Sequence, residues 1–184
     1  MLNINFNPFP QLTSERLILR RVGVTDADEM FRYRSDKELM RFIPHRLAHE
    51  KKEIDEMIKM INSRIDKKES INWAITLKGI DVIIGTVGFV KINEAHLRAE
   101  IGYMLHTPYH KQGIAAEATR RVIDYGFDVM KLHSIEAIVN HENMLSRKVL
   151  ENLGFTNDAY FRDYLYHAGK FVDANVYSLI KKDE

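Results

Sequence analysis

The residues whose types and spacing most clearly suggest a chemical function surround Gly113, in the stretch YHKQGIAAEATRRVIDYG. A short polar run ends at this glycine, and apolar residues at helical spacing follow it, beginning with Ala115, Ala118 and Val122. The first turn of a helix has unpaired N–H groups and a partial positive charge, which together suit a phosphate. Gly113 would let the backbone approach such an anion closely, but it would equally allow a tight turn from strand to helix. A single glycine leaves both interpretations open.

Other reactive side chains exclude more chemistry than they indicate. The chain contains no cysteine, which excludes disulfides, thiolate metal ligands and a covalent cysteine intermediate. His106 and His110 are four residues apart, but Pro108 lies between them, so they do not share a helix face as a pair of metal ligands would. We therefore expect no metal site. The sequence also has no Walker motif and no dinucleotide-binding fingerprint.

Composition indicates a globular chain with one core. Its 184 residues are 45% hydrophobic and 29% charged, which predicts a single domain over residues 1–184. The net charge of +1, with no long block of like charge, argues against a nucleic-acid or membrane partner. The N-terminal MLNINFNPFPQ lacks the features of a signal peptide, and no apolar stretch reaches about 18 residues. We expect a cytoplasmic protein whose partners are small ligands.

The elements that must position Gly113 follow from periodicity. Helical patterns cover residues 50–66, the segment from Gly113 to Val129, and residues 143–153, with Asn143 as N-cap. A further helix is expected after Thr25, where Asp28 would complete a capping box. The predicted strands are residues 15–22, 71–77, 82–90, 98–106, 134–140, 155–166 and 171–180.

These elements predict an α/β sheet protein. The strand 98–106 leads through Gly113 into a helix and then to the strand 134–140, which could lie parallel to it. Within the strand 82–90, the GTVG at residues 85–88 is interpreted as a bulge rather than a nucleotide loop.

Three linked motifs narrow the interpretation. AEIGYML, HKQGIAAEA and NHENMLSRKVLENLGF, in this order and spacing, resemble the GNAT superfamily of acyl-CoA N-acyltransferases, and within it the ribosomal-protein N-acetyltransferase branch. The resemblance extends from LTSERLILR to the terminal DANVYSLIKK. It implies a mixed, mostly antiparallel sheet of about seven strands flanked by about four helices, splayed between strands 98–106 and 134–140.

The resemblance also implies where acetyl-CoA binds. The loop 110–115 would hold the pyrophosphate, mostly through backbone N–H groups. His110 stands where the family usually has glutamine or arginine. Backbone groups near the end of strand 98–106 would pair with the pantetheine arm. The implied cofactor-binding residues are Met104, Leu105, His110, Lys111, Gln112, Gly113, Ile114, Ala115 and Asn143.

Two side chains are the candidates for catalysis. Acyl transfer to an amine needs a neutral amine, a polarised carbonyl and a proton for the leaving thiolate. Glu100, on a strand face with Gly102 and Met104, matches the family's frequent base position; the alternative is a rim carboxylate. Ser146 matches the proposed proton donor of the ribosomal-protein branch; the alternative is that it satisfies a local backbone group. The tyrosine acid common in the family is absent, because its position is Leu150.

The resemblance implies an acetyl-CoA-dependent N-acetyltransferase in which the amine attacks directly, since no cysteine could carry the acetyl group. The alternative is a CoA-binding regulatory module without turnover. The acceptor would enter between the loop around Arg41, Phe42, Pro44 and His45 and the hairpin 164–170. These segments are not strongly acidic, so a protein N-terminus or a small-molecule amine is favoured over a polyamine. The oligomeric state is open, with a homodimer among the alternatives.

Overall fold

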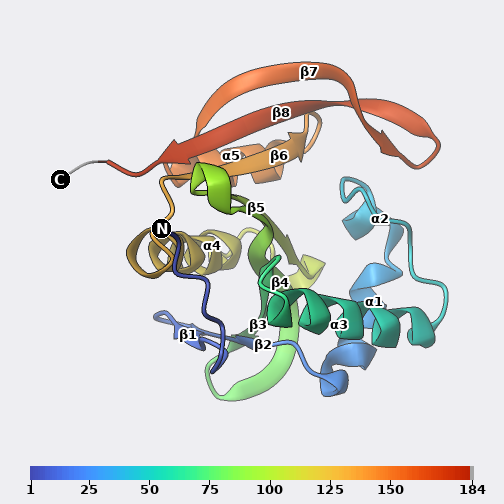
Figure 1. Cartoon of the computed structure of the whole chain (residues 1–184). Coiled ribbons are helices and arrows are strands. Elements are labelled where there is room, and N and C mark those ends of the chain that lie inside the picture. Colours follow the sequence, from blue (N-terminus) through green and yellow to red (C-terminus); the bar gives the residue numbers. More distant parts are fainter. Residues whose placement is uncertain (183–184) are drawn as a thin grey trace.

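One eight-stranded sheet organises the protein, which is described here for residues 1–182 by a computed structural model (Figure 1). The order in the sheet is β1-β2-β3-β4-β5-β6-β8-β7, and every neighbouring pair is antiparallel except β5 and β6. The mixed, mostly antiparallel sheet is therefore confirmed, with one more strand than predicted. The strands are β1 (Leu12–Thr13), β2 (Leu17–Arg21), β3 (Ile71–Leu77), β4 (Ile80–Asn93), β5 (Arg98–Leu105), β6 (Ser134–Asn140), β7 (Thr156–His167) and β8 (Lys170–Ile180).

Within residues 1–182, five α-helices cover the two faces of this sheet. α1 and α3 pack together on one face, whereas α4 packs against β4 and β5 on the other and has α5 beside it. The helices are α1 (Ala27–Arg34), α2 (Lys37–Met40), α3 (Lys51–Asp66), α4 (Ile114–Asp124) and α5 (Met144–Asn152). The additional helix is α2, a single turn whose first N–H groups are capped by Asp36. Four residues are too few to show a helical period.

Two glycines of β4 lie where the backbones of neighbouring strands approach closely. Gly85 and Gly88 lie in regular register with β5 and β3. A Cβ atom on Gly88 would lie only 2.1 Å from the backbone oxygen of Ile71, so the close strand approach requires glycine. Residues 85–88 themselves pair without a register shift, so the predicted bulge does not lie within them. The irregularities flank them: the pairing with β3 shifts directly beyond Gly85, between Ile75 and Leu77, and the pairing with β5 shifts between Phe89 and Lys91.

β5 and β6 separate soon after they begin to pair. Their parallel register comprises Arg98 with Ser134, Ala99 with Ile135, and Glu100 with Glu136. Beyond Glu100, the two strands have no register pair in the described part of the chain. The predicted splay therefore lies between residues 101–105 of β5 and 137–140 of β6.

Two predicted helix details are wrong. Thr25 and Asp28 do not form a capping box; instead the carboxylate of Asp26 accepts from the Gly23 N–H at 2.8 Å and from the Arg20 guanidinium. The helix after Gly113 does not continue regularly to Val129, because a π-helical turn begins at Tyr125. The changed repeat rotates Val129 away from the buried face, and it is 42% exposed.

No helix within residues 1–182 is long and apolar enough to span a membrane.

Candidate active site

The N-terminus of α4 has the geometry of an anion-binding site. Gly113 is its N-cap and has φ +76°, in the left-handed region that favours glycine. The first backbone bond inside the helix runs from the Glu117 N–H to the Gly113 oxygen, at 3.0 Å. The N–H groups of Ile114, Ala115 and Ala116 therefore precede the first N–H that donates within the helix, as at any helix start. They are available to an anion.

The loop before Gly113 is held by its own side chains. His110 Nε2 lies 2.6 Å from the backbone oxygen of Leu105, and since a carbonyl only accepts, Nε2 carries the donated proton. Gln112 Nε2 donates to the Pro108 oxygen at 2.8 Å, and Lys111 adopts φ +59°. His110 thus ties the loop 110–115 to the end of β5.

Arg16, which no local pattern in the sequence singles out, supports this loop from the position just before β2. Its Nη1 donates to the Gln112 oxygen at 3.0 Å, and its Nε forms an ion pair with Glu117 at 2.7 Å. Ser14 Oγ and the Arg16 N–H also donate to the Glu117 carboxylate. Partial burial acts to raise the pKa of Glu117, but these hydrogen bonds and the Arg16 charge outweigh it and lower the pKa. The partners lie 101 residues apart, so no local pattern could reveal them.

Glu100 lies at the last position where β5 pairs with β6, and the two strands part beyond it. It is half-buried, with Lys91 opposite it on β4 and Glu136 opposite it on β6. Burial raises the pKa of Glu100, the negative charge of Glu136 raises it further, and Lys91 partly offsets both. Arg98 pairs with Glu136 at 3.3 Å. A carboxyl with a raised pKa beside the opening is suited to accept a proton.

The backbone of β5 beyond Glu100 faces the opening at alternate residues. The His106 N–H donates to the Ile84 oxygen on β4 at 2.8 Å. Backbone groups of successive strand residues point to opposite sides, so those of Leu105 point toward the splay and those of Met104 toward β4. Of the two predicted pantetheine partners, the alternation favours Leu105, whose oxygen already accepts from His110.

The N-terminus of α5 brings Asn143 and Ser146 together. Asn143 Oδ1 accepts from the Ser146 N–H at 3.1 Å, so the predicted N-cap is confirmed. Ser146 Oγ does not cap its own helix; it lies 2.8 Å from the hydroxyl of Tyr103 on β5. Burial raises the pKa of Tyr103 to about 12, although the hydrogen bond with Ser146 lowers it and Tyr177 raises it. Tyr103 was not among the predicted site residues.

Arg147, the residue after Ser146 on α5, makes intramolecular contacts. Its Nε donates to the Tyr177 hydroxyl at 3.1 Å, and its Nη1 donates to the His141 oxygen at 3.2 Å. Tyr177 in turn donates to Glu151 at 2.8 Å. Arg147 therefore links the start of α5 to β8.

A cavity of about 360 Å³ joins the two segments from which the acceptor was expected to enter. Arg41, Phe42 and His45 line it from the loop after α2, and His167 and Lys170 line it from the β7–β8 hairpin. Figure 1 shows the tip of this hairpin reaching over α2. Partial burial lowers the pKa of His45, and the neighbouring charges of Arg34 and His167 lower it further. Pro44 is not among the lining residues of the described cavity.

The same cavity reaches the open end of the splay. Asn140, the last residue of β6, and Glu142, just before α5, also line it. An amine in this cavity would therefore approach the separated strands from the side of the β6 C-terminus.

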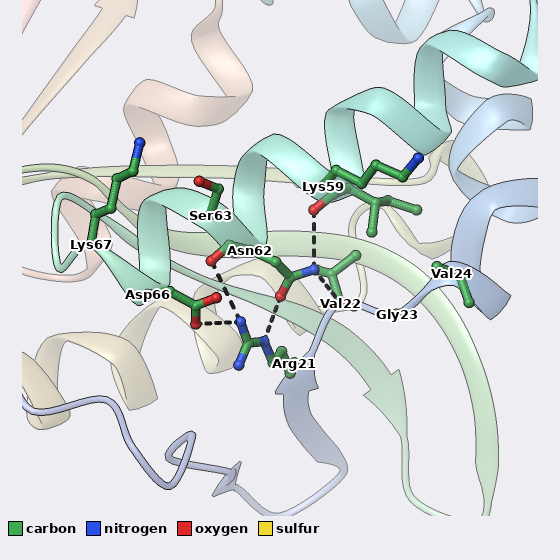
Figure 2. A pocket seen from close by; sticks show the side chains of 10 residues that line it. Arg21, Val22, Gly23, Val24, Lys59, Asn62, Ser63, Asp66 and Lys67 are labelled. Atoms are coloured by element: carbon green, nitrogen blue, oxygen red, sulfur yellow. Dashed lines mark hydrogen bonds and ion pairs between the residues drawn. The ribbon is translucent and has the colours of Figure 1, made fainter.

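A second, more open hollow of about 640 Å³ lies between β2 and α3 (Figure 2). Its polar groups bind one another: Arg21 donates to the side chain and backbone of Asn62 and pairs with Asp66 at 2.7 Å. Asn62 Nδ2 also donates to backbone oxygens of Val22 and Ile58. These satisfied groups make it a structural junction of β2 and α3, apart from the splay.

Among residues 1–182, no three histidine, aspartate or glutamate side chains form a group able to hold a metal ion.

An opening between parallel strands, with an anion-binding helix end beside it, suits a long donor molecule that carries phosphates at one end. An acyl-CoA is such a donor, which indicates an acyl-CoA-dependent acyltransferase. A family profile described as acetyltransferase (GNAT) domain matches residues 16–156. The chain belongs to the GNAT acetyltransferase family, and it is an N-acetyltransferase with acetyl-CoA as co-substrate.

Individual relatives agree with this assignment. The uncharacterized N-acetyltransferase p20 of Bacillus licheniformis is 37% identical over 172 residues, which cover 94% of this chain and 97% of the relative. The solved ribosomal-protein-S5-alanine acetyltransferase of Vibrio fischeri is 26% identical with a TM-score of 0.83, covering 95% of this chain and 98% of that one. Spermidine N(1)-acetyltransferase of Escherichia coli K12 is 31% identical over 90 residues, covering 49% of this chain and 48% of the relative. The expected likeness to ribosomal-protein acetyltransferases is confirmed.

Proposed function

We propose that this N-acetyltransferase acetylates an α-amine of a protein N-terminus, or a small-molecule amine of similar basicity, with Glu100 as base and Ser146 as proton donor to the leaving thiol. The observation that carries the proposal is the splay between β5 and β6. Glu100 marks the point where the strands part, and the N-terminus of α4 follows β5 along the chain. The remaining steps depend on what each wall of the opening offers.

The phosphates of acetyl-CoA would be bound by the loop 110–115. The N–H groups of Ile114 and Ala115, at the start of α4, would donate to the pyrophosphate, while Gly113 leaves room for its approach. Lys111 would add a positive charge. Leu105 and Met104, at the end of β5, would contact the pantetheine arm, and Asn143, His110 and Gln112 complete the proposed set.

Catalysis would divide between the two strands and α5. Glu100, whose pKa is raised, would accept the amine proton through a water molecule. Acetyl-CoA supplies the thioester carbonyl, which the amine attacks directly. Ser146 would hydrogen-bond the sulfur as it leaves. The absence of cysteine agrees with a single ternary complex, because no thiol is available to carry the acetyl group.

The acceptor cavity is not built for a polycation. Its lysine and arginine side chains number three and its carboxylates two, and two histidines lie beside them. They are Lys37, Arg41, Lys170, Glu38, Glu142, His45 and His167. A polyamine such as spermidine carries several positive charges, and an excess of carboxylates in the cavity would be needed to complement them. An α-amine, with a reference pKa of about 7.7 to 8.0 against about 10.4 for lysine, also needs less assistance from a base.

A two-part experiment tests the proposal. Calorimetric titration with acetyl-CoA, with ATP and NAD as comparisons, should show selective binding of acetyl-CoA. Release of the CoA thiol is then measured with N-terminal peptides, lysine peptides and spermidine in parallel. N-terminal peptides or small α-amines should give the highest kcat/KM. A clear preference for spermidine or for lysine side chains would overturn the proposed acceptor.

Variants test the assigned roles. Glu100→Gln and Ser146→Ala should each lower kcat by about a hundredfold, the range of a lost general acid or base, with acetyl-CoA affinity changed less than about twofold. Glu94→Gln, an exposed carboxylate in the turn before β5, serves as the matched control and should keep its activity. Equal, large losses of acetyl-CoA binding in both site variants would contradict the roles.

The cytoplasmic location, the homodimer and the single domain over residues 1–184 stay predictions.

A further inference from the structure

The hydroxyl that contacts Ser146 comes from a different element. Tyr103 Oη lies 2.8 Å from Ser146 Oγ and 3.1 Å from the Ser146 backbone oxygen. Tyr103 belongs to β5 and Ser146 to the first turn of α5, so the contact reaches from one wall of the opening to the other. Position 150, where many family members have a tyrosine acid, is the fully buried Leu150. A tyrosine is therefore present beside Ser146, but it is supplied by the strand.

We propose that Tyr103 is a positioning residue for Ser146: its phenol donates to Ser146 Oγ, which leaves the serine proton free to be donated to the departing sulfur. This inference rests on the role proposed above for Ser146. It answers a chemical difficulty of that role, because an aliphatic hydroxyl alone is a weak acid. A phenol is a stronger acid, and as a hydrogen-bond donor it stabilises negative charge that develops on Ser146 Oγ.

Hydrogen-bond accounting supports this direction of donation. Tyr103 has one hydroxyl hydrogen and two acceptors within reach, both on Ser146. The backbone oxygen of Ser146 lies in the first turn of α5, where residue 150 is its regular helical donor. The Ser146 Oγ has Tyr103 as its only partner among the described residues. Donation of the phenol proton to Oγ therefore satisfies the acceptor that has no other donor.

Burial keeps the phenol in its neutral, donating form. It raises the pKa of Tyr103 to about 12, with the Ser146 hydrogen bond lowering it and Tyr177 raising it. Two charged residues of α5, Arg147 and Glu151, are joined through the Tyr177 hydroxyl. Tyr103 thus retains its proton throughout the ordinary assay range.

The transfer step balances in atoms and charge. A bond forms between the amine nitrogen and the acetyl carbon, and the bond from that carbon to sulfur breaks with its electron pair going to sulfur. Ser146 gives its proton to the sulfur while the Tyr103 proton moves toward Ser146 Oγ. The proton lost by the amine goes through water to Glu100 and from there to solvent, and solvent returns one proton to the pair of hydroxyls. The products are one amide and one thiol.

The first test removes only the hydroxyl. Tyr103→Phe should lower kcat about tenfold to a hundredfold, with the acetyl-CoA dissociation constant changed less than about twofold. Tyr125→Phe is the matched control, since Tyr125 is also buried but packs edge-on against Trp73, with ring centroids 5.4 Å apart. It should retain wild-type kcat. Weaker acetyl-CoA binding with unchanged kcat in Tyr103→Phe would show a merely structural contact and overturn the inference.

A double-mutant cycle tests whether Tyr103 acts through Ser146. Adding Tyr103→Phe to Ser146→Ala should cause no further loss of kcat, because the partner is already absent. Independent, multiplying losses would overturn the inference. If Ser146→Ala itself keeps full kcat, the proposed role of Ser146 fails and the inference fails with it. If Ser146→Ala lowers kcat and Tyr103→Phe does not, the inference fails alone.

A graded change in acidity gives a readout that packing would not produce. Site-specific replacement of Tyr103 by 3-fluorotyrosine keeps the ring and hydroxyl but makes the phenol more acidic. Because the fluorinated phenol is a stronger donor, kcat should rise a few-fold above that of the wild type, opposite to the loss expected for Tyr103→Phe. The affinity for acetyl-CoA should stay constant. A kcat that does not respond to the acidity of the phenol would contradict the proposed donation.

Discussion

At the scale of single residues, Glu100 shows how a fold raises the pKa of a carboxyl. Its strand neighbour Glu136 and its partial burial both disfavour the charged form, whereas Lys91 favours it. The same interactions lower the free energy of unfolding at any pH where Glu100 is charged. A buried carboxyl with a raised pKa therefore destabilises the folded protein at neutral pH.

Replacing Glu100 by Gln should stabilise the protein at neutral pH. The pKa of Glu100 is raised on folding, so the folded state holds its proton more tightly, and stability falls as the pH rises from the ordinary glutamate value through the raised one. Glutamine removes this loss. Thermal unfolding of Glu100→Gln and wild type should differ at pH 7 and converge below about pH 4, near the reference pKa of about 4.3. A variant less stable than wild type at pH 7 would contradict the raised pKa.

Charge changes beside Glu100 should move the acid limb of the rate profile in opposite directions. With Glu100 as the base, kcat/KM rises with pH as Glu100 ionises, at a pH above that of an ordinary glutamate. Glu136→Gln removes a like charge and should move the limb to lower pH, whereas Lys91→Met should move it to higher pH. Arg98, released from Glu136, would add to the first shift. Profiles of kcat/KM against pH check both; limbs that stay fixed would exclude Glu100 as the titrating base.

At the scale of elements, Gly113 connects a backbone conformation to the proposed phosphate site. Its positive φ opens α4, and Arg16 and Glu117 hold the surrounding loop. The sequence could predict this turn because glycine has a strong local signature. It could not predict Arg16, since the contact depends on β2 and α4 being brought together by the sheet.

Gly113→Ala should weaken acetyl-CoA binding about tenfold, because the strained loop would lose at least one charge-assisted hydrogen bond to the pyrophosphate. Its left-handed φ should also cost about 1 kcal/mol of stability. Gly169→Ala is the matched control: Gly169 has φ +83° in the hairpin turn, and an added Cβ would meet nothing within 4 Å. It should lose similar stability and keep its affinity, as calorimetry and thermal unfolding would show. Equal affinities in the two variants would exclude Gly113 from the phosphate site.

Long, strongly periodic elements were predictable and short ones were not. The strand 71–77 and the helix 50–66 agree closely with β3 and α3, because their apolar periods persist over several repeats. β1 comprises two residues and α2 four, too few for any period. The π-helical turn at Tyr125 retains the apolar residues of a helix while changing the repeat, so the exposure of Val129 was missed.

At the scale of the whole molecule, the site is assembled from segments that the chain keeps far apart. Leu105 and Glu100 come from β5, Ser146 from α5, and the acceptor cavity from the loop after α2 together with the β7–β8 hairpin. The resemblance located these segments. The contact between Tyr103 and Ser146 required the sheet order, because only the parallel neighbours β5 and β6 bring α5 beside β5.

Reversing charge on both sides of the acceptor cavity should change which amines are used. Arg41→Glu combined with Lys170→Glu converts an excess of bases into an excess of carboxylates. Because two unit charges 4 Å apart interact by about 1 kcal/mol in water and more near a protein, kcat/KM for spermidine should rise at least about tenfold relative to that for an N-terminal peptide. Added salt should reduce the change. Thiol-release assays with both acceptors measure it.

The matched control for this change is Lys67→Glu, which reverses a charge at the hollow between β2 and α3 (Figure 2). Lys67→Glu replaces a base by a carboxylate, as the cavity substitutions do, but at a different place on the molecule. The measured quantity is the ratio of kcat/KM for spermidine to kcat/KM for an N-terminal peptide. If this ratio depends only on the net charge of the protein, each reversed charge should change it equally at Lys67 and in the cavity, and the cavity would not be the acceptor site. If position decides, Lys67→Glu should leave the ratio within about twofold of wild type, because exposed charges farther apart than about 10 Å are screened at ordinary ionic strength. We expect the second result, since the cavity lies where the tip of the hairpin meets α2 and the end of β6, and a charge there acts on the amine at short range.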